Sequence, residues 1–142
     1  MTSGPRLYNL FPLLVGPVAR WGDELPRIAA MGFDWVYVNP FHAPGFSGSL
    51  YAVKDYFRLH PDLDDGRPMD EQLGEFVRRA EGVGLRVMMD LVVNHTSKDA
   101  DLVAQHPDWF VRDEAGALVS PVAVDPDDPT QATEWGDLAR LD

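Results

Sequence analysis

An aspartate, an asparagine and a histidine lie together at the end of an almost continuously apolar stretch of this 142-residue sequence. The stretch covers residues 85–93 (LRVMMDLVV), and Asn94 and His95 follow it directly. Strand alternation would place Asp90 and Asn94 on one face. Burying an unpaired carboxylate costs several kcal/mol, so we expect Asp90 to meet a cation or a hydrogen-bond donor. Spacing alone favours a structural aspartate over a functional one.

Other polar side chains in loops are weaker candidates for chemistry. Residues 62–66 (DLDDG) hint at a calcium loop, but their glycine is one position early for an EF-hand and no glutamate follows at the required place, so a solvated turn is expected. His42 by itself indicates a surface histidine, and Lys54 a solvated loop lysine. His60 and His106, each followed by proline, are expected to be structural. The absence of cysteine excludes disulfides, thiolate zinc sites and cysteine nucleophiles.

Three strand-like segments must position these residues. They cover residues 6–12 (RLYNLFP), 33–39 (FDWVYVN) and 85–93. Apolar residues at helical spacing predict a helix over 21–31 and another after Asp70, its expected N-cap, ending near Gly82. Strands that alternate with helices predict a parallel sheet and the α/β class.

The remaining segments have less regular patterns. Residues 41–68 are rich in Gly, Ser and Pro and are expected to form a long loop. Residues 99–105 predict a short helix, and residues 135–141 the beginning of another. No clear period runs through residues 109–129.

The composition restricts the partners. There are 23 acidic residues against 12 basic ones, a formal net charge of −11, which opposes binding to nucleic acid or to an anionic membrane. Eleven of the acidic residues lie in 99–142. Such a stretch is usually solvated surface, and the alternative is that it supplies oxygen ligands for a hard cation. The apolar stretch 7–19 is broken by an asparagine and two prolines, and no other run approaches the roughly 18 apolar residues of a membrane span, so a cytoplasmic location is expected.

Residues 90–95 (DLVVNH) resemble the first conserved region, D-x-x-x-N-H, of the α-amylase family of glycoside hydrolases and transglycosylases, glycoside hydrolase family 13. Three more segments agree in order and spacing. Residues 31–40 (MGFDWVYVNP) resemble the family's second barrel strand, and residues 50–56 (LYAVKDY) its G-Y-D-x-x-D-Y loop. Residues 106–110 (HPDWF) resemble the segment that often follows the third strand. One such match occurs by chance, whereas four in register are specific.

The resemblance implies a (β/α)8 TIM barrel, of which this sequence supplies roughly the first three β/α units and the start of the excursion after the third strand. Residues 1–98 would belong to the barrel and residues 99–142 to the inserted loop or subdomain. A complete barrel needs about 250 residues, so the first and third strands are expected to be edges of the sheet.

The resemblance also implies roles for two residues at the sugar. Tyr51 would stack on the sugar ring bound beside the scissile bond, because an aromatic face suits the apolar C–H face of a pyranose. His95 would form a hydrogen bond with a hydroxyl group of the same sugar, and His42 lies in a loop that could touch substrate. Leu50 and Ala52 stand where many members have Gly and Asp, so the contacts of this loop differ from theirs.

The resemblance implies that further residues position other side chains or loops and do not contact the sugar themselves. Asp90 would hold an arginine that lies further along the family's sequence. Asn94 ligates calcium in many relatives and elsewhere fixes the loop, so calcium is the only candidate cofactor. Asp55 and Tyr56 would shape the loop through hydrogen bonds and packing.

The function that the resemblance implies is cleavage or transfer of α-glucosidic linkages in glucans or maltooligosaccharides by a retaining mechanism. The family's nucleophile and acid/base carboxylates, about 5–5.5 Å apart, are expected beyond Asp142, so the 142-residue chain alone is expected to be inactive. The alternative is a non-catalytic glucan-binding fragment, or the remnant of a truncated gene, that binds sugar weakly through Tyr51 and His95. An unrelated α/β enzyme would fit the element order but not the four segments. The sequence leaves the oligomeric state open.

Overall fold

The computed structural model describes residues 4–142. Its helices and strands, in chain order, are β1 (Leu7–Leu10), α1 (Pro12–Val15), α2 (Val18–Ala30), β2 (Trp35–Val38), β3 (His42–Pro44), β4 (Val53–Leu59), α3 (Met69–Gly82), β5 (Arg86–Met89), β6 (His95–Ser97), α4 (Asp101–Gln105), the 3-10 helix η1 (Pro107–Trp109), β7 (Val122–Val124), β8 (Ala132–Glu134) and β9 (Leu138–Arg140). The chain divides into two compact units. Unit 1 is the chain up to Phe41 together with Phe57–Leu91, and unit 2 is His42–Tyr56 together with Val92–Asp142.

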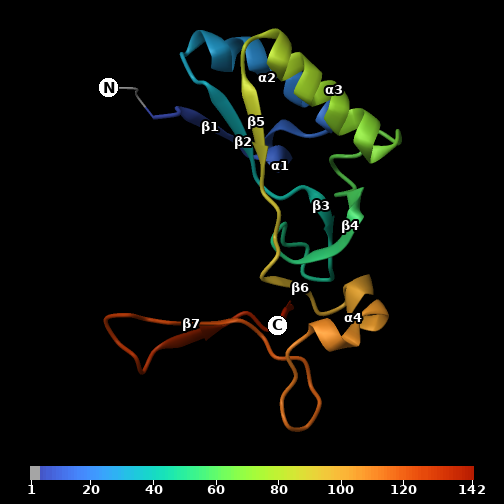
Figure 1. Ribbon diagram of the computed structural model, residues 1–142, viewed down its shortest axis with the longest axis vertical. Coiled ribbons are helices and arrows are strands. Elements are labelled where there is room, and N and C mark those ends of the chain that lie inside the picture. Colours follow the sequence, from blue (N-terminus) through green and yellow to red (C-terminus); the bar gives the residue numbers. More distant parts are fainter. Residues whose placement is uncertain (1–3) are drawn as a thin grey trace. The chain divides into compact units, whose positions relative to one another are not determined.

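Unit 1 is built on a three-stranded parallel sheet in the order β1-β2-β5. Trp35 of β2 pairs with Leu7 on one side and with Arg86 on the other. Helices α2 and α3 lie side by side along this sheet (Figure 1). The predicted α/β class is therefore confirmed, and within the described residues β1 and β5 are the edges of this sheet, as expected. Within residues 4–142, no helix is long and apolar enough to cross a membrane.

The core of unit 1 is centred on Trp21 of α2, which is fully buried. Its ring meets Phe76 of α3 edge-on at a centroid distance of 5.4 Å, and Phe41 at 6.2 Å. Its indole N–H donates a hydrogen bond of 2.8 Å to the carbonyl of Gly16. The apolar faces that the helical spacing predicts for α2 and α3 therefore meet in one core against the sheet.

Several predicted boundaries in unit 1 are wrong. The strand expected over 6–12 ends at Leu10, and Pro12–Val15 form the helix α1, which was not predicted. Helix α3 begins at Met69, directly after Pro68, so Asp70 lies in the first turn instead of at the N-cap. A carboxylate in the first turn still interacts favourably with the helix dipole. Strand β5 ends at Met89, so Asp90 follows the strand and strand alternation does not extend to Asn94. Of the apolar residues that follow the strand, Val92 is buried, whereas Leu91 and Val93 are exposed.

In unit 2, the expected long loop contains regular structure. Strands β3 and β4 form a two-stranded sheet, and the amide of Gly45 donates a hydrogen bond of 2.8 Å to the carbonyl of Ala52. The Gly- and Ser-rich segment between these strands hides the hairpin in the sequence, although Val53–Leu59 (VKDYFRL) is itself rich in strand-forming residues.

The C-terminal part of unit 2 contains short helices and short strands joined by irregular segments. The predicted short helix is present as α4. The helix expected over 135–141 is wrong, because Leu138–Arg140 form β9, which pairs antiparallel with β6. Leu138 and Ala139 are buried there, so tertiary pairing overrides the local helical tendency. Strands β7 and β8 form a separate hairpin (Figure 1).

Candidate active site

The structure brings Tyr51, Asn94 and His95 together in unit 2. The His95 Nε2 atom lies 3.1 Å from the carbonyl oxygen of Tyr51, which is 44 residues away in the chain. The Asn94 side-chain amide nitrogen lies 3.2 Å from His95 Nδ1. A carbonyl can only accept and an amide NH2 group can only donate. The neutral histidine tautomer with its proton on Nε2 therefore satisfies both hydrogen bonds.

These three residues line a pocket of about 380 Å³ within unit 2. Its lining residues are Ser49, Tyr51, Asn94, His95, Pro121, Trp135, Asp137 and Leu138. The pocket is within the size range of small-molecule sites, about 300–1,000 Å³. Tyr51 is 43% exposed and Trp135 is 44% exposed, so two aromatic side chains are accessible at one pocket. Such rings can pack against the apolar C–H face of a sugar while the neighbouring imidazole, amide and carboxylate meet its hydroxyl groups.

Five of the lining residues were not identified as site residues from the sequence, and Trp135 is the aromatic one among them. It lies between β8 and β9, in the segment for which a helix was expected. The only local signal for it is an aromatic residue followed by Gly136 and Asp137. Its place at the pocket depends on the pairing of β9 with β6, which the sequence does not reveal.

Tyr56 and His42 lie at the two ends of the segment His42–Tyr56, which contains Tyr51 and is called the Tyr51 loop below. The Tyr56 hydroxyl donates a hydrogen bond of 2.7 Å to the carbonyl of Val92, which agrees with its predicted structural role, and burial raises the pKa of Tyr56. The ring of His42 lies 5.5 Å from the ring of Tyr56. His42 is only 6% exposed, so the surface position expected for it is wrong. Burial lowers the pKa of His42, and the nearby carboxylate of Asp55 in β4 opposes that shift.

Asp99 joins the Tyr51 loop to the segment after His95. Its carboxylate accepts hydrogen bonds from Ser97 Oγ at 2.5 Å and from the Phe46 amide at 3.3 Å, and it forms an ion pair of 3.1 Å with Lys54. Lys54 is therefore paired instead of simply solvated. These contacts, led by the Ser97 hydrogen bond, lower the pKa of Asp99. A side chain at Gly45 would overlap Ser97 and Asp99, so glycine is required for this close approach.

Asp90 belongs to unit 1 and has the kind of partner that the sequence predicts. Its Oδ2 atom accepts a hydrogen bond of 2.7 Å from the Tyr37 hydroxyl on the neighbouring strand. The carboxylate at the end of β5 is thus stabilised by a neutral donor.

Metal binding has little support in this geometry. Within residues 4–142, no three His, Asp or Glu side chains converge as metal ligands. Calcium takes six to eight oxygen ligands, whereas Asn94 offers one amide oxygen and its nitrogen donates to His95. The residues around Asn94 therefore do not fit a calcium site.

The remaining sequence candidates have structural roles. Asp64, in the acidic stretch 62–66, accepts hydrogen bonds from the Gly66 amide at 2.9 Å and from Gln72 at 2.8 Å, which gives the expected turn. His60 is buried and accepts a hydrogen bond from the Asp62 amide. His106 stacks on Trp109 with ring centroids 3.9 Å apart.

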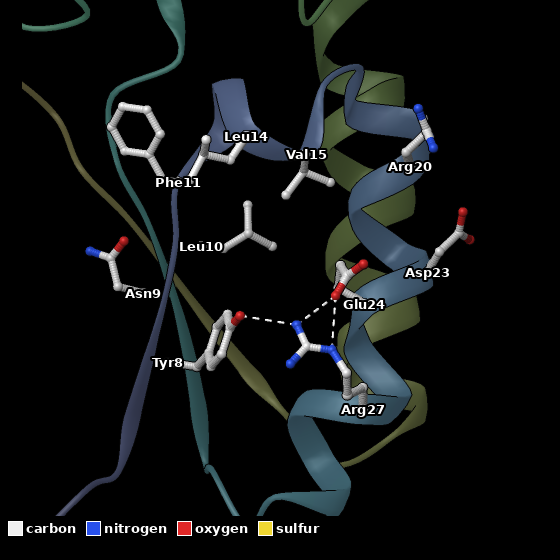
Figure 2. Close-up of a pocket in the computed structure, with 10 residues that line it drawn as sticks. All are labelled: Tyr8, Asn9, Leu10, Phe11, Leu14, Val15, Arg20, Asp23, Glu24 and Arg27. Atoms are coloured by element: carbon white, nitrogen blue, oxygen red, sulfur yellow. Dashed lines mark hydrogen bonds and ion pairs between the residues drawn. The ribbon is translucent and has the colours of Figure 1, made fainter.

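Unit 1 has a separate pocket of about 400 Å³ between β1 and α2 (Figure 2). Arg27, one of the polar residues that line it, contacts two other lining residues. The guanidinium donates to the Tyr8 hydroxyl at 3.0 Å and forms an ion pair of 2.6 Å with Glu24 (Figure 2). None of the residues predicted to bind sugar lines this pocket.

Comparison with solved structures identifies the class of fold. An α-amylase from Lactobacillus plantarum has a similar solved structure, with a TM-score of 0.76 and 29% sequence identity. The similarity covers 97% of this chain and 32% of that one. This chain therefore has the fold of part of an α-amylase TIM barrel.

The sequence comparisons define the family. Residues 6–125 match the family described as glycogen debranching enzyme, glucanotransferase domain. The chain belongs to the α-amylase family, glycoside hydrolase family 13, which confirms the resemblance inferred from the four segments.

Two relatives illustrate the range of this family. An α-1,4-glucan:maltose-1-phosphate maltosyltransferase from Arcanobacterium haemolyticum is 30% identical over 78% of this chain. A probable α-glucosidase from Rhizobium meliloti is 34% identical over 76% of this chain. The matches cover 20% and 19% of those two proteins, so this chain spans about a fifth of their length.

Proposed function

We propose that this chain is the N-terminal, sugar-binding part of an α-amylase-family enzyme that cleaves or transfers α-glucosidic linkages of glucans or maltooligosaccharides. The observation that carries the proposal is the hydrogen bond between His95 and the Tyr51 carbonyl, which sets an exposed aromatic ring beside an imidazole at one pocket. The names of the relatives, a glucan maltosyltransferase and a probable glucosidase, agree with transfer or hydrolysis.

The proposal includes a division of the chain. Residues 1–98 form roughly the first three β/α units of the barrel, and residues 99–142 begin the excursion after the third strand. The order β1-β2-β5, with a helix between each pair of strands, supports the first part.

The proposed reaction retains the anomeric configuration. One carboxylate attacks the sugar and another protonates the leaving oxygen, the two being about 5–5.5 Å apart. In this proposal both carboxylates lie outside the present chain, whose residues bind and orient the sugar. Tyr51 stacks on the sugar ring beside the scissile bond. His95 shares its Nε2–H between the Tyr51 carbonyl and a sugar hydroxyl, because both ring nitrogens already have partners within the protein.

Three further residues position the groups that bind the sugar. Asn94 orients the imidazole of His95 through its contact with Nδ1. Asp55 supports the loop from β4. Asp90, held through Oδ2 by Tyr37, offers its other carboxylate oxygen to an arginine supplied by a later part of the enzyme.

Titration of the 142-residue chain with maltotriose, followed by calorimetry, tests the proposed site. We expect Tyr51→Ala to weaken binding about tenfold through loss of the aromatic face, and Tyr51→Phe to keep most of the affinity. Phe57→Ala, which removes another exposed aromatic ring outside the pocket, is the control. Absence of binding, or binding unchanged in Tyr51→Ala, would refute the site. Binding by the complete gene product without any turnover would favour the alternative, a non-catalytic glucan-binding protein.

A further inference from the structure

We propose that Trp135 is a second sugar-contacting aromatic residue at the pocket lined by Tyr51, Asn94 and His95. The inference rests on the proposed function and adds to it a specificity residue from the segment after β6.

The backbone amide and the backbone carbonyl of Trp135 both form hydrogen bonds. Its amide donates a hydrogen bond of 3.1 Å to the carbonyl of Pro121, and its own carbonyl accepts one of 3.0 Å from the amide of Leu138. Leu138 begins β9, where it pairs with Ser97 of β6. The strand that begins with His95 therefore holds the segment that carries Trp135.

The indole of Trp135 is partly exposed at this pocket. Trp21 is fully buried in the core of unit 1, and Trp109 is stacked on His106. Trp135 instead lines the pocket together with Tyr51. Two aromatic rings at one pocket can contact two faces of one pyranose ring or two successive glucose units.

Asp137 lines the same pocket. Its carboxylate can accept hydrogen bonds from the hydroxyl groups of a sugar that lies against the indole of Trp135.

Tryptophan fluorescence and calorimetry during a maltotriose titration of the 142-residue chain test this inference. We expect a fluorescence change in the unsubstituted chain that is lost in Trp135→Phe. We expect Trp135→Phe to stay within about threefold of the original affinity and Trp135→Ala to lose about tenfold. Trp109→Phe is the matched control and should keep both the affinity and the fluorescence change, because Trp109 does not line the pocket.

The outcomes separate this inference from the proposed function. If Tyr51→Ala weakens binding while Trp135→Ala does not and Trp135→Phe keeps the fluorescence change, the role of Trp135 is refuted and the proposed function stands. If maltotriose does not bind at all, the proposed function fails as well. Circular dichroism spectra identify a variant that fails to fold, and in that case the fluorescence of Trp135→Phe decides.

Discussion

Lys54 and Asp99 form an ion pair of 3.1 Å that joins two segments 45 residues apart in the chain. The first segment carries Tyr51 and the second follows His95 directly. The ion pair is partly exposed, so it contributes at most about 1 kcal/mol by itself. The hydrogen bond from the buried Ser97 hydroxyl to the same carboxylate is the stronger constraint on the loop.

Substitution of Asp99 should separate these two effects. We expect Asp99→Ala to lower the free energy of unfolding by about 1–3 kcal/mol, because the buried Ser97 hydroxyl loses its acceptor. We expect Asp99→Asn, which keeps an acceptor oxygen, and Lys54→Met to cost less than about 1 kcal/mol each. Urea denaturation measures all three. A cost for Lys54→Met as large as that for Asp99→Ala would assign the stability to the ion pair instead.

The buried His42 should make the stability depend on pH. Burial lowers its pKa in the folded state, whereas the unfolded value is about 6.5. Between these two values the unfolded state binds more protons, so the free energy of unfolding rises with pH in this window and falls as the pH drops below about 6.5. We expect thermal unfolding between pH 7.5 and 5.5 to show this loss, and His42→Gln to reduce it. The same slope in His42→Gln would contradict the assignment to His42.

The tautomer of His95 can be measured without any substitution. The hydrogen bonds to Tyr51 and from Asn94 require a proton on Nε2 and none on Nδ1 in the neutral ring. Nitrogen-15 NMR of the labelled chain at pH 8 should show this tautomer as the dominant neutral form. We expect Asn94→Ala to weaken that preference, because Nδ1 then loses its donor. A dominant Nδ1–H form would mean that the contact with the Tyr51 carbonyl is absent.

Two phenylalanines provide a matched test of the core of unit 1. Phe76 is 2% exposed and packs against Trp21, whereas Phe57 is 83% exposed. We expect Phe76→Ala to cost about 3–5 kcal/mol of unfolding free energy through lost burial and a cavity. We expect Phe57→Ala to stay within about 0.5 kcal/mol, as is usual for surface positions. Equal effects in chemical denaturation would place the core elsewhere.

The sequence predicts unit 1 better than unit 2, and the reason is local periodicity. The helical spacing of Trp21, Leu25 and Ile28 predicts α2, and the aromatic and β-branched run at Trp35–Val38 predicts β2. Both patterns reflect burial against the same core, so each segment carries its own signal. Errors in unit 1 are the short helix α1, which was not predicted, and boundaries such as the end of β5 before Asp90.

In unit 2 the structure depends on long-range pairing. β9 pairs with β6, and Arg140 at its end also forms backbone hydrogen bonds with Val111 and Val119. The hairpin of β3 and β4 contains a Gly- and Ser-rich segment that predicts a loop. Trp135 was missed because its place at the pocket depends on the pairing of β9 with β6. Tyr51, Asn94 and His95 were found only because their segments resemble a known family, since spacing alone cannot show that residues 44 positions apart meet.

The most direct measurement of the central claim is the reaction of the complete gene product that contains this chain with maltooligosaccharides, followed by proton NMR of the first products. The proposed retaining reaction predicts hydrolysis or transfer products that appear first in the α-anomeric form, with activity reduced by Tyr51→Ala. A folded protein that neither hydrolyses nor transfers these sugars, or one whose first product is the β-anomer, would contradict the claim.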